Sequence, residues 1–113
     1  MKLTINDHAI EVKWEENESV SRLKELAKDG LTIQGEGNGG FEQVAALPES
    51  ISSNDVHQEA VSGDIMLYVG RYLCFFYGEN AWAYTKIGHM EEEQSTLTEL
   101  LSKGPIEVTL SLS

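Results

Sequence analysis

The chain has 113 residues, of which 41% are hydrophobic and 24% charged, a composition typical of a folded chain and not of a disordered one. This length suits one domain, residues 1–113, and is short for two. Acidic residues outnumber basic ones by 19 to 8, which gives a formal net charge of -11. Because nucleic acids and anionic membrane surfaces are bound largely through clustered Lys and Arg, we expect neither as a partner.

Cysteine content and the N-terminal sequence bear on the compartment. Cys74 is the only cysteine, so no internal disulfide is predicted, and its neighbours Leu73 and Phe75 predict a buried thiol. Residues 1–6 contain no apolar segment typical of a signal peptide, and no apolar run approaches the roughly 18 residues of a membrane span. We therefore expect a cytoplasmic protein.

The N-terminal third predicts a β-hairpin followed by a helix. Hydrophobic residues alternate through 2–14 around an Asn-Asp pair at 6–7, which tolerates the positive φ angles of a type I′ turn. Ser19 is a suitable N-cap for a helix over about 19–29, where hydrophobic residues recur at helical spacing. Gly30 stands where a glycine often ends a helix.

The next part of the chain is rich in glycine and polar residues. Residues 31–33 predict a short strand, residues 35–40 a flexible glycine-rich loop, and residues 41–45 a second strand. The loop lacks the Gly-Lys-Ser/Thr of a phosphate-binding loop, and it precedes a strand where a dinucleotide-binding fingerprint would precede a helix. Residues 46–62 are expected to form a long irregular connection.

The strongest strand pattern lies in the centre of the chain. Residues 65–69 and 72–77 are hydrophobic runs separated by Gly70-Arg71, which predicts a hairpin with a type II′ turn. Because consecutive positions are hydrophobic, both faces of this hairpin are expected to be covered. A further strand is expected over 82–87.

The C-terminal part predicts a helix and a last strand. Residues 96–99, Thr-Leu-Thr-Glu, fit a capping box, Gly-Pro at 104–105 ends the helix, and residues 106–112 alternate as a strand. The sum is about eight strands and two helices without strand–helix–strand alternation. We predict a mainly β fold, an antiparallel sheet closed or nearly closed into a barrel and capped by the two helices.

Residues with catalytic or metal-binding chemistry are scattered. His8, His57 and His89 are isolated, and only His89, beside the glutamates at 91–93, suggests a chance metal site. There is no Gly-x-Ser-x-Gly elbow, although a triad assembled from distant residues stays open. We predict no catalytic residue, no metal and no cofactor.

The aromatic residues are concentrated in the central strands. If Leu73 and Phe75 fill the barrel, strand alternation places Tyr72, Cys74 and Phe76 on its outer face. An aromatic strip on the outside of a sheet is a candidate binding surface.

Several stretches of this sequence resemble a known family. Residues 63–68 (Gly-Asp-Ile-Met-Leu-Tyr), 74–76 (Cys-Phe-Phe) and 86–90 (Lys-Ile-Gly-His-Met), followed by a helix and a closing strand, resemble the second half of a cyclophilin. Together with residues 47–50 (Leu-Pro-Glu-Ser), they are similar to a family of small prokaryotic cyclophilin-like domains whose function is largely unassigned. The resemblance covers nearly the whole chain. It implies an eight-stranded barrel capped by two helices, with an outer groove for proline-containing peptides.

The resemblance also implies roles for single residues. Phe76 matches the phenylalanine that floors the proline pocket, Cys74 matches the glutamine of the groove, and Tyr68 lies near the peptide path. The catalytic arginine of cyclophilins should fall within residues 41–45, where no arginine is present. That arginine supports the twisted imide nitrogen, and the uncatalysed barrier is ~18–20 kcal/mol. We therefore expect no appreciable isomerase activity.

Three functions remain open. The one we predict is a non-catalytic binding module for a peptide or small ligand, with Tyr68, Tyr72, Phe76 and Glu49 as candidate ligand-binding residues. The alternatives are an atypical peptidyl-prolyl isomerase or other enzyme, and an accessory subunit that packs against a protein partner or against another copy of itself.

Overall fold

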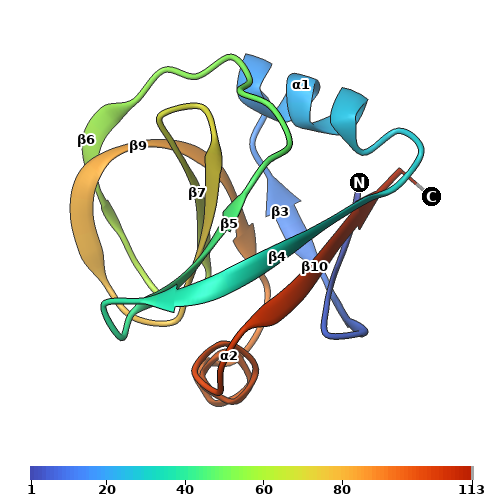
Figure 1. Cartoon of the computed structure of the whole chain (residues 1–113). Coiled ribbons are helices and arrows are strands. Elements are labelled where there is room, and N and C mark those ends of the chain that lie inside the picture. Colours follow the sequence, from blue (N-terminus) through green and yellow to red (C-terminus); the bar gives the residue numbers. More distant parts are fainter. Residues whose placement is uncertain (113) are drawn as a thin grey trace.

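The computed structural model describes residues 1–112 and shows a curled β-sheet with two helices outside it (Figure 1). The strands of this described part are β1 (Lys2–Ile5), β2 (His8–Ile10), β3 (Val12–Trp14), β4 (Leu31–Asn38), β5 (Glu42–Ala46), β6 (Val56–Ala60), β7 (Asp64–Tyr68), β8 (Tyr72–Phe76), β9 (Asn80–Met90) and β10 (Ile106–Ser111). The helices are α1 (Glu18–Leu26) and α2 (Gln94–Leu101). Neither is long and apolar enough to cross a membrane.

The sheet is antiparallel throughout and curls until its two end strands lie close together, which makes a nearly closed barrel. Its order is β2-β1-β10-β4-β5-β8-β7-β9-β3, and β6 pairs with β9 beside this path. The end strands β2 and β3 are separated along the chain by Glu11 alone, whose carbonyl accepts a hydrogen bond from the Glu91 N–H. The predicted mainly β fold with a nearly closed barrel and two helices is confirmed. The described residues form ten strands where eight were predicted.

The N-terminal hairpin is shorter than predicted. Its turn is confirmed, because Asn6 and Asp7 have φ angles of 50° and 66°. Its second arm ends at Ile10, however, and residues 12–14 leave it to pair with β9. The continuous alternation through 2–14 hid this change of partner, since both short strands keep a hydrophobic residue on the inward face.

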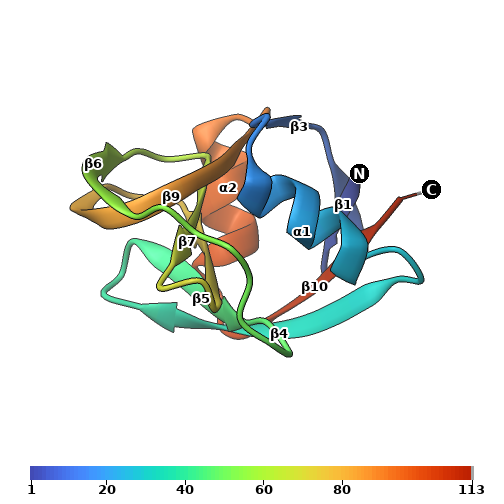
Figure 2. The same ribbon diagram turned by 90° about the horizontal axis from the view of Figure 1, so that it is seen from above.

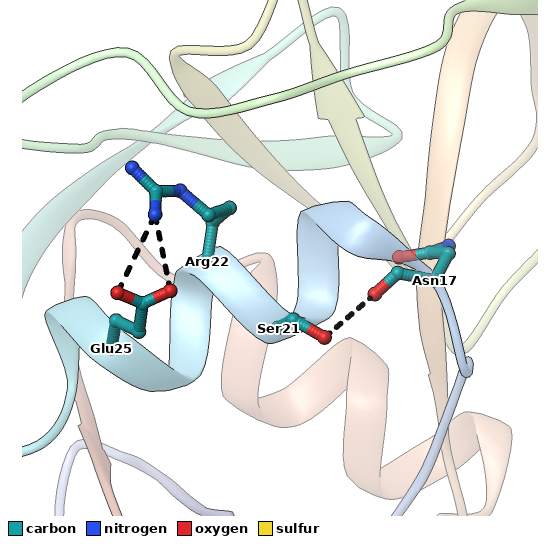
Figure 3. A network of polar contacts seen from close by, with 4 residues as sticks. All are labelled: Asn17, Ser21, Arg22 and Glu25. Atoms are coloured by element: carbon teal, nitrogen blue, oxygen red, sulfur yellow. Dashed lines mark hydrogen bonds and ion pairs between the residues drawn. The ribbon is translucent and has the colours of Figure 1, made fainter.

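Helix α1 begins after Asn17, so the predicted N-cap at Ser19 is wrong. The Asn17 side chain accepts a hydrogen bond from the Val20 N–H at 2.9 Å, while the Ser19 hydroxyl donates to the Ser52 carbonyl at 2.7 Å. Figure 3 shows the exposed contacts of this helix, from the Ser21 hydroxyl to the Asn17 carbonyl and between Arg22 and Glu25. The helix ends at Leu26 and not at 29 as predicted, with Ala27 as its C-cap, and Gly30 follows the turn of residues 27–29 with a φ of 89°.

Replacing Asn17 with alanine is expected to lower the free energy of unfolding by about 0.5–2 kcal/mol, because the capping acceptor is lost. The same change also removes the hydrogen bond from Asn17 Nδ2 to the Lys86 carbonyl. Chemical denaturation followed by circular dichroism measures the change. Ser21→Ala is the control, since the Ser21 hydroxyl makes only a long, exposed contact of 3.3 Å.

The glycine-rich segment is mostly strand and not loop. Strand β4 continues to Asn38 and pairs residues 35–38 with β5, and the turn is confined to residues 39–41. Gly35 has a packing reason, because a Cβ atom there would lie 2.8 Å from the Ile106 side chain. Glycine in this strand therefore permits close approach of β10.

The connection predicted as irregular over 46–62 contains strand β6 and is tied down before it. The Leu47 and Ile51 N–H groups donate to the carbonyls of Arg71 and Gly70 in the β7–β8 turn. Asp55 then accepts hydrogen bonds from the Val69 N–H and from the hydroxyl of Thr85, a residue of β9. These bonds hold the entry to β6 against the barrel.

The central hairpin β7–β8 is covered on both faces, as the two hydrophobic runs predicted. Its turn lies one residue earlier than predicted. Val69 and Gly70 both have positive φ, at 46° and 71°, and the Arg71 N–H closes the turn on the Tyr68 carbonyl. Two positive φ values define a type I′ geometry, so the predicted type II′ turn at Gly70-Arg71 is wrong. At Gly70 a Cβ atom would also lie 2.7 Å from the Ile51 carbonyl oxygen.

Helix α2 begins at Gln94, so the predicted capping box at residues 96–99 is wrong, because Thr96 lies inside the helix. Gln94 Nε2 donates hydrogen bonds to the Tyr77 carbonyl and to the Thr98 hydroxyl one turn further along the helix. Glu93 is the N-cap residue and its side chain makes no capping hydrogen bond. The hydrophobic spacing of α2 predicts an inward stripe of Leu97, Leu100 and Leu101, of which Leu97 and Leu101 are buried and Leu100 is partly buried against the core.

The hydrophobic residues form two clusters that lie on opposite faces of the central strands. The larger one fills the barrel and includes Leu73, Phe75 and the inward side chains of both helices. The smaller cluster lies on the outer face and consists of Ala60, Met66, Cys74, Phe76 and Tyr84. Viewed from above, α1 and α2 lie beside the barrel and away from β6 (Figure 2). The outer cluster is therefore covered by strands and not by helices.

Candidate ligand-binding groove

A two-stranded arm folds over the outer face of the barrel. Strand β9 pairs with β7 and β3 through residues 85–90 and with β6 through residues 80–84. Figure 1 shows β6 and the curved β9 bending away from the other strands. We call β6 and residues 80–84 the β6–β9 arm. It brings the Tyr84 ring onto the outer side of the barrel strands, against Phe76.

A groove of about 720 Å³ opens between this arm and strands β4, β5 and β8. Its aromatic lining consists of Phe41, Tyr68, Tyr72, Trp82 and Tyr84. Its other lining residues are Gln34, Glu36, Gly37, Asn38, Glu42, Val44, Ala46, Cys74 and Asn80. We call this space the outer groove. A volume of several hundred Å³ with mainly apolar walls and few polar groups is typical of small-ligand sites.

The rings in and beneath the groove contact one another. Phe76 is fully buried, with its centroid 6.0 Å from that of Phe41 and 5.7 Å from that of Tyr84, to which it lies edge-on. Tyr68 lies 6.5 Å from Tyr84 and 6.4 Å from Tyr72. Such contacts fix ring orientation and add to the stabilisation from burial. The groove is therefore largely preformed.

A buried carboxyl group lies in the wall of the groove. Glu42 is only 4% exposed, and its Oε2 accepts a hydrogen bond of 2.8 Å from Asn38 Nδ2. Its Oε1 is buried without a conventional N–H or O–H donor. Burial raises the pKa of the Glu42 carboxyl group, and the Asn38 bond and a weak thiol contact from Cys74 offset this only in part.

Two further groups in the groove, the Cys74 thiol and the Tyr84 hydroxyl, also have raised pKa values. Burial raises the pKa of the Cys74 thiol far above its usual range, and the negative charge of Glu42 adds to the effect. Burial raises the pKa of Tyr84 as well, although a hydrogen bond from Asn80 to its hydroxyl works in the opposite direction. Cys74 is therefore a neutral, unreactive thiol at physiological pH, as its hydrophobic neighbours predicted.

Glu42→Gln is expected to make the protein more stable at neutral pH. Because the folded state raises this pKa, it keeps a proton that the unfolded chain releases, so stability falls as pH rises from the ordinary carboxyl value through the folded pKa. The variant lacks this loss. Its advantage in melting temperature over the wild type should therefore grow as pH rises above the ordinary carboxyl range of about 4.

The control for this prediction is Glu16→Gln, which removes the same charge from an exposed position outside the groove. An equal gain in both variants would assign the effect to net charge. A Glu42→Gln protein that is less stable at every pH would contradict the prediction.

The structure brings together three of the four predicted binding residues. Tyr68 and Tyr72 line the outer groove, and Phe76 lies beneath it in contact with the lining residue Phe41. Alternation along β8 was therefore predicted correctly, although Phe76 and Cys74 are buried and do not form an exposed strip. Glu49 is exposed and outside the lining of the groove.

Sequence reasoning missed Glu42. Cross-strand pairing places it opposite Phe76, and two residues further along β5 Val44 lies opposite Cys74. Had the alternation been continued from β8 onto the strand predicted at 41–45, Glu42 would have been assigned to the same face as Phe76. A carboxylate on a face otherwise made of hydrophobic and aromatic residues is the signal that was available.

Neither arginine of the chain lies in the groove. Arg22 pairs with Glu25 on the exposed face of α1, and Arg71 donates from Nε to the Leu47 carbonyl at 2.6 Å. The lining residues from β5 are Glu42, Val44 and Ala46. A guanidinium group that could support a twisted proline nitrogen is thus missing from the lining formed by residues 1–112.

His89 has a partner other than the neighbouring glutamates. Its Nδ1 lies 2.8 Å from Oδ1 of Asp64, a residue that is 4% exposed. Within residues 1–112, no three His, Cys, Asp or Glu side chains are arranged to hold a metal ion. The chance metal site at His89 and residues 91–93 is therefore not formed by these residues.

The fold and the groove define a class: small, nearly closed antiparallel β-barrels whose outer face, and not their interior, carries the concave surface. The chain matches the model of the cyclophilin-like family over residues 3–111, and it belongs to that family. The family resemblance inferred from the sequence is thereby confirmed. A comparison with curated proteins gives no match.

Proposed function

We propose that this protein is a ligand-binding domain that holds a small molecule in the outer groove and does not catalyse prolyl isomerisation. The observation that carries this proposal is the aromatic-lined groove of about 720 Å³ with a single buried carboxyl group in its wall. Preformed aromatic walls offer dispersion and burial to an apolar ligand, while one polar group fixes its orientation.

The groove chemistry argues against isomerase activity. Acceleration of X-Pro rotation needs a donor that stabilises the twisted imide against a barrier of ~18–20 kcal/mol. At the place expected for that donor, β5 offers Glu42, and Cys74 stands where the resemblance predicts a glutamine. A buried acid and a weakly polar thiol make a poor replacement for an arginine and an amide.

The proposal can be tested by NMR with isotope-labelled protein, a panel of X-Pro peptides and a library of small aromatic and aliphatic compounds. We expect amide shifts around Tyr68, Tyr72 and Tyr84 with some small compounds, and no increase in peptide cis/trans exchange. Faster exchange would contradict the loss of catalysis. Shift changes with the peptides alone would indicate a peptide ligand in place of a small molecule. No shift change with any compound, together with a hydrodynamic radius larger than that of a monomer, would favour the accessory-subunit alternative.

A further inference from the structure

Both charged residues in the described lining of the outer groove are acidic. Glu36 on β4 and Glu42 on β5 belong to its lining, and the part of the lining formed by residues 1–112 contains no Lys, Arg or His. Asp55 also lies close enough to raise the pKa of the Cys74 thiol through its charge. In a protein of net charge -11, an anionic ligand would meet repulsion in this groove and no partner of opposite charge.

The rings of the groove suit a positive charge as well as an apolar group. The faces of Trp and Tyr rings attract ammonium and guanidinium groups, and Trp is the most effective of them. Trp82 is 55% exposed at the groove, while Tyr84 is 4% exposed and Tyr68 is half-buried. A ligand entering past Trp82 would therefore meet aromatic surface first and a carboxyl group further in.

The carboxyl group of Glu42 is incompletely bonded for a group that is 4% exposed. Buried side-chain oxygens nearly always have a hydrogen-bond partner, and a native exception calls for an explanation. Among residues 1–112, Glu42 Oε1 lacks a conventional donor, and the contacts of the carboxyl group are the amide of Asn38, an exposed residue that also lines the groove, and the weak thiol of Cys74. A cationic N–H donor could displace this amide and reach the carboxylate.

From this arrangement we infer that the outer groove binds a small organic amine, whose ammonium group pairs with Glu42 and whose apolar part packs against Tyr68, Tyr84 and Trp82. The inference rests on the proposed function, because it names the ligand class of the same groove. The ammonium group supplies the donors that Glu42 lacks, and its charge favours the ionised form of the carboxyl group.

Binding should therefore be coupled to proton release from Glu42. The titratable groups that line the groove with Glu42 are Glu36 from β4, Tyr68 from β7, Tyr72 and Cys74 from β8 and Tyr84 from β9, and Asp55 lies close enough to act on Cys74. The pKa of Cys74 and that of Tyr84 are raised, so both groups stay protonated at neutral pH. We expect the affinity for an amine to increase as pH rises above the ordinary carboxyl range, and to lose this dependence in Glu42→Gln.

The experiment compares three probes of one carbon skeleton: phenethylamine, 2-phenylethanol and phenylacetate. Dissociation constants are measured by NMR titration of wild type, Glu42→Gln and the control Glu16→Gln. We expect phenethylamine to bind wild type and Glu16→Gln alike, at least about tenfold tighter than either other probe, and to lose about tenfold in Glu42→Gln. Backbone spectra and unfolding midpoints establish that each variant is folded.

The outcomes separate the ligand class from ligand binding itself. If 2-phenylethanol or phenylacetate binds around Tyr68 and Tyr84 as well as the amine does, the amine inference is overturned while the proposed function stands. The same holds if Glu42→Gln leaves amine affinity unchanged. If none of the probes and no compound of the wider library shifts these residues, both the inference and the proposed function are overturned.

Discussion

Replacing Phe76 with alanine is expected to lower the free energy of unfolding by about 3–5 kcal/mol. Phe76 is fully buried on the outer face of β8 and contacts the rings of Phe41 and Tyr84. Its removal would leave a cavity between the barrel and the β6–β9 arm. The strands on both sides are fixed by backbone pairing, so they cannot move in to fill it. Urea denaturation followed by tryptophan fluorescence and circular dichroism measures the loss.

The matched control for Phe76 is Tyr72→Ala, four residues earlier on the same face of the same strand. Tyr72 is 38% exposed, so its removal is expected to cost only about 1 kcal/mol or less. Equal losses in the two variants would contradict the assignment of Phe76 to a second core. They would instead make it one more exposed member of an aromatic surface.

Replacing Asp64 with alanine is expected to lower the free energy of unfolding by about 2–3 kcal/mol. Asp64 Oδ2 accepts a hydrogen bond of 2.9 Å from the Val61 N–H, and Oδ1 lies 2.8 Å from His89 Nδ1 and 3.8 Å from Lys86 Nζ. His89 and Lys86 are partly exposed, so water recovers part of their interaction when the carboxylate is removed. The larger share of the loss comes from the turn that Asp64 closes with Val61.

Asp64→Asn is the control, because an amide keeps the shape and can still accept from the Val61 N–H. Because asparagine keeps the turn hydrogen bond, its loss should be less than half that of the alanine variant. Thermal and urea unfolding of both variants measure the difference. An alanine variant that loses less than about 1 kcal/mol would show that the turn is held by other contacts.

Local signals predicted much of the fold because their physics is local. A pair of residues that tolerates positive φ, at Asn6 and Asp7, is enough to define a turn. Hydrophobic residues at consecutive positions in β7 and β8 indicated a strand pair covered on both sides, and this pair holds the two clusters apart. Alternation along β8 then separated Phe75 inside the barrel from Phe76 outside it.

Features that depend on distant partners could not be predicted in the same way. Strand β6 reads Val-His-Gln-Glu-Ala, and it pairs with one neighbour and is mostly exposed, so it has no hydrophobic alternation to reveal it. The N-cap of α1 moved to Asn17 because Ser19 bonds to Ser52, a residue thirty-three positions away. Alternation could have placed Glu42 on the Phe76 face, but its burial depends on Asn38 across a turn and on strand β8, which no local pattern shows.

Strand β9 belongs to two structural units at once, the barrel and the β6–β9 arm. Its residues 85–90 are bonded into the barrel, while residues 80–84 are bonded only to β6. One side of the groove is therefore formed by the barrel itself and the other by the β6–β9 arm, whose pairing is separate from the barrel. Substitutions at exposed arm positions such as Trp82 are expected to cost little stability, whereas floor positions such as Phe76 are constrained by it. Under the proposed function, changes at the exposed residues of this arm would alter ligand specificity while the barrel stays the same.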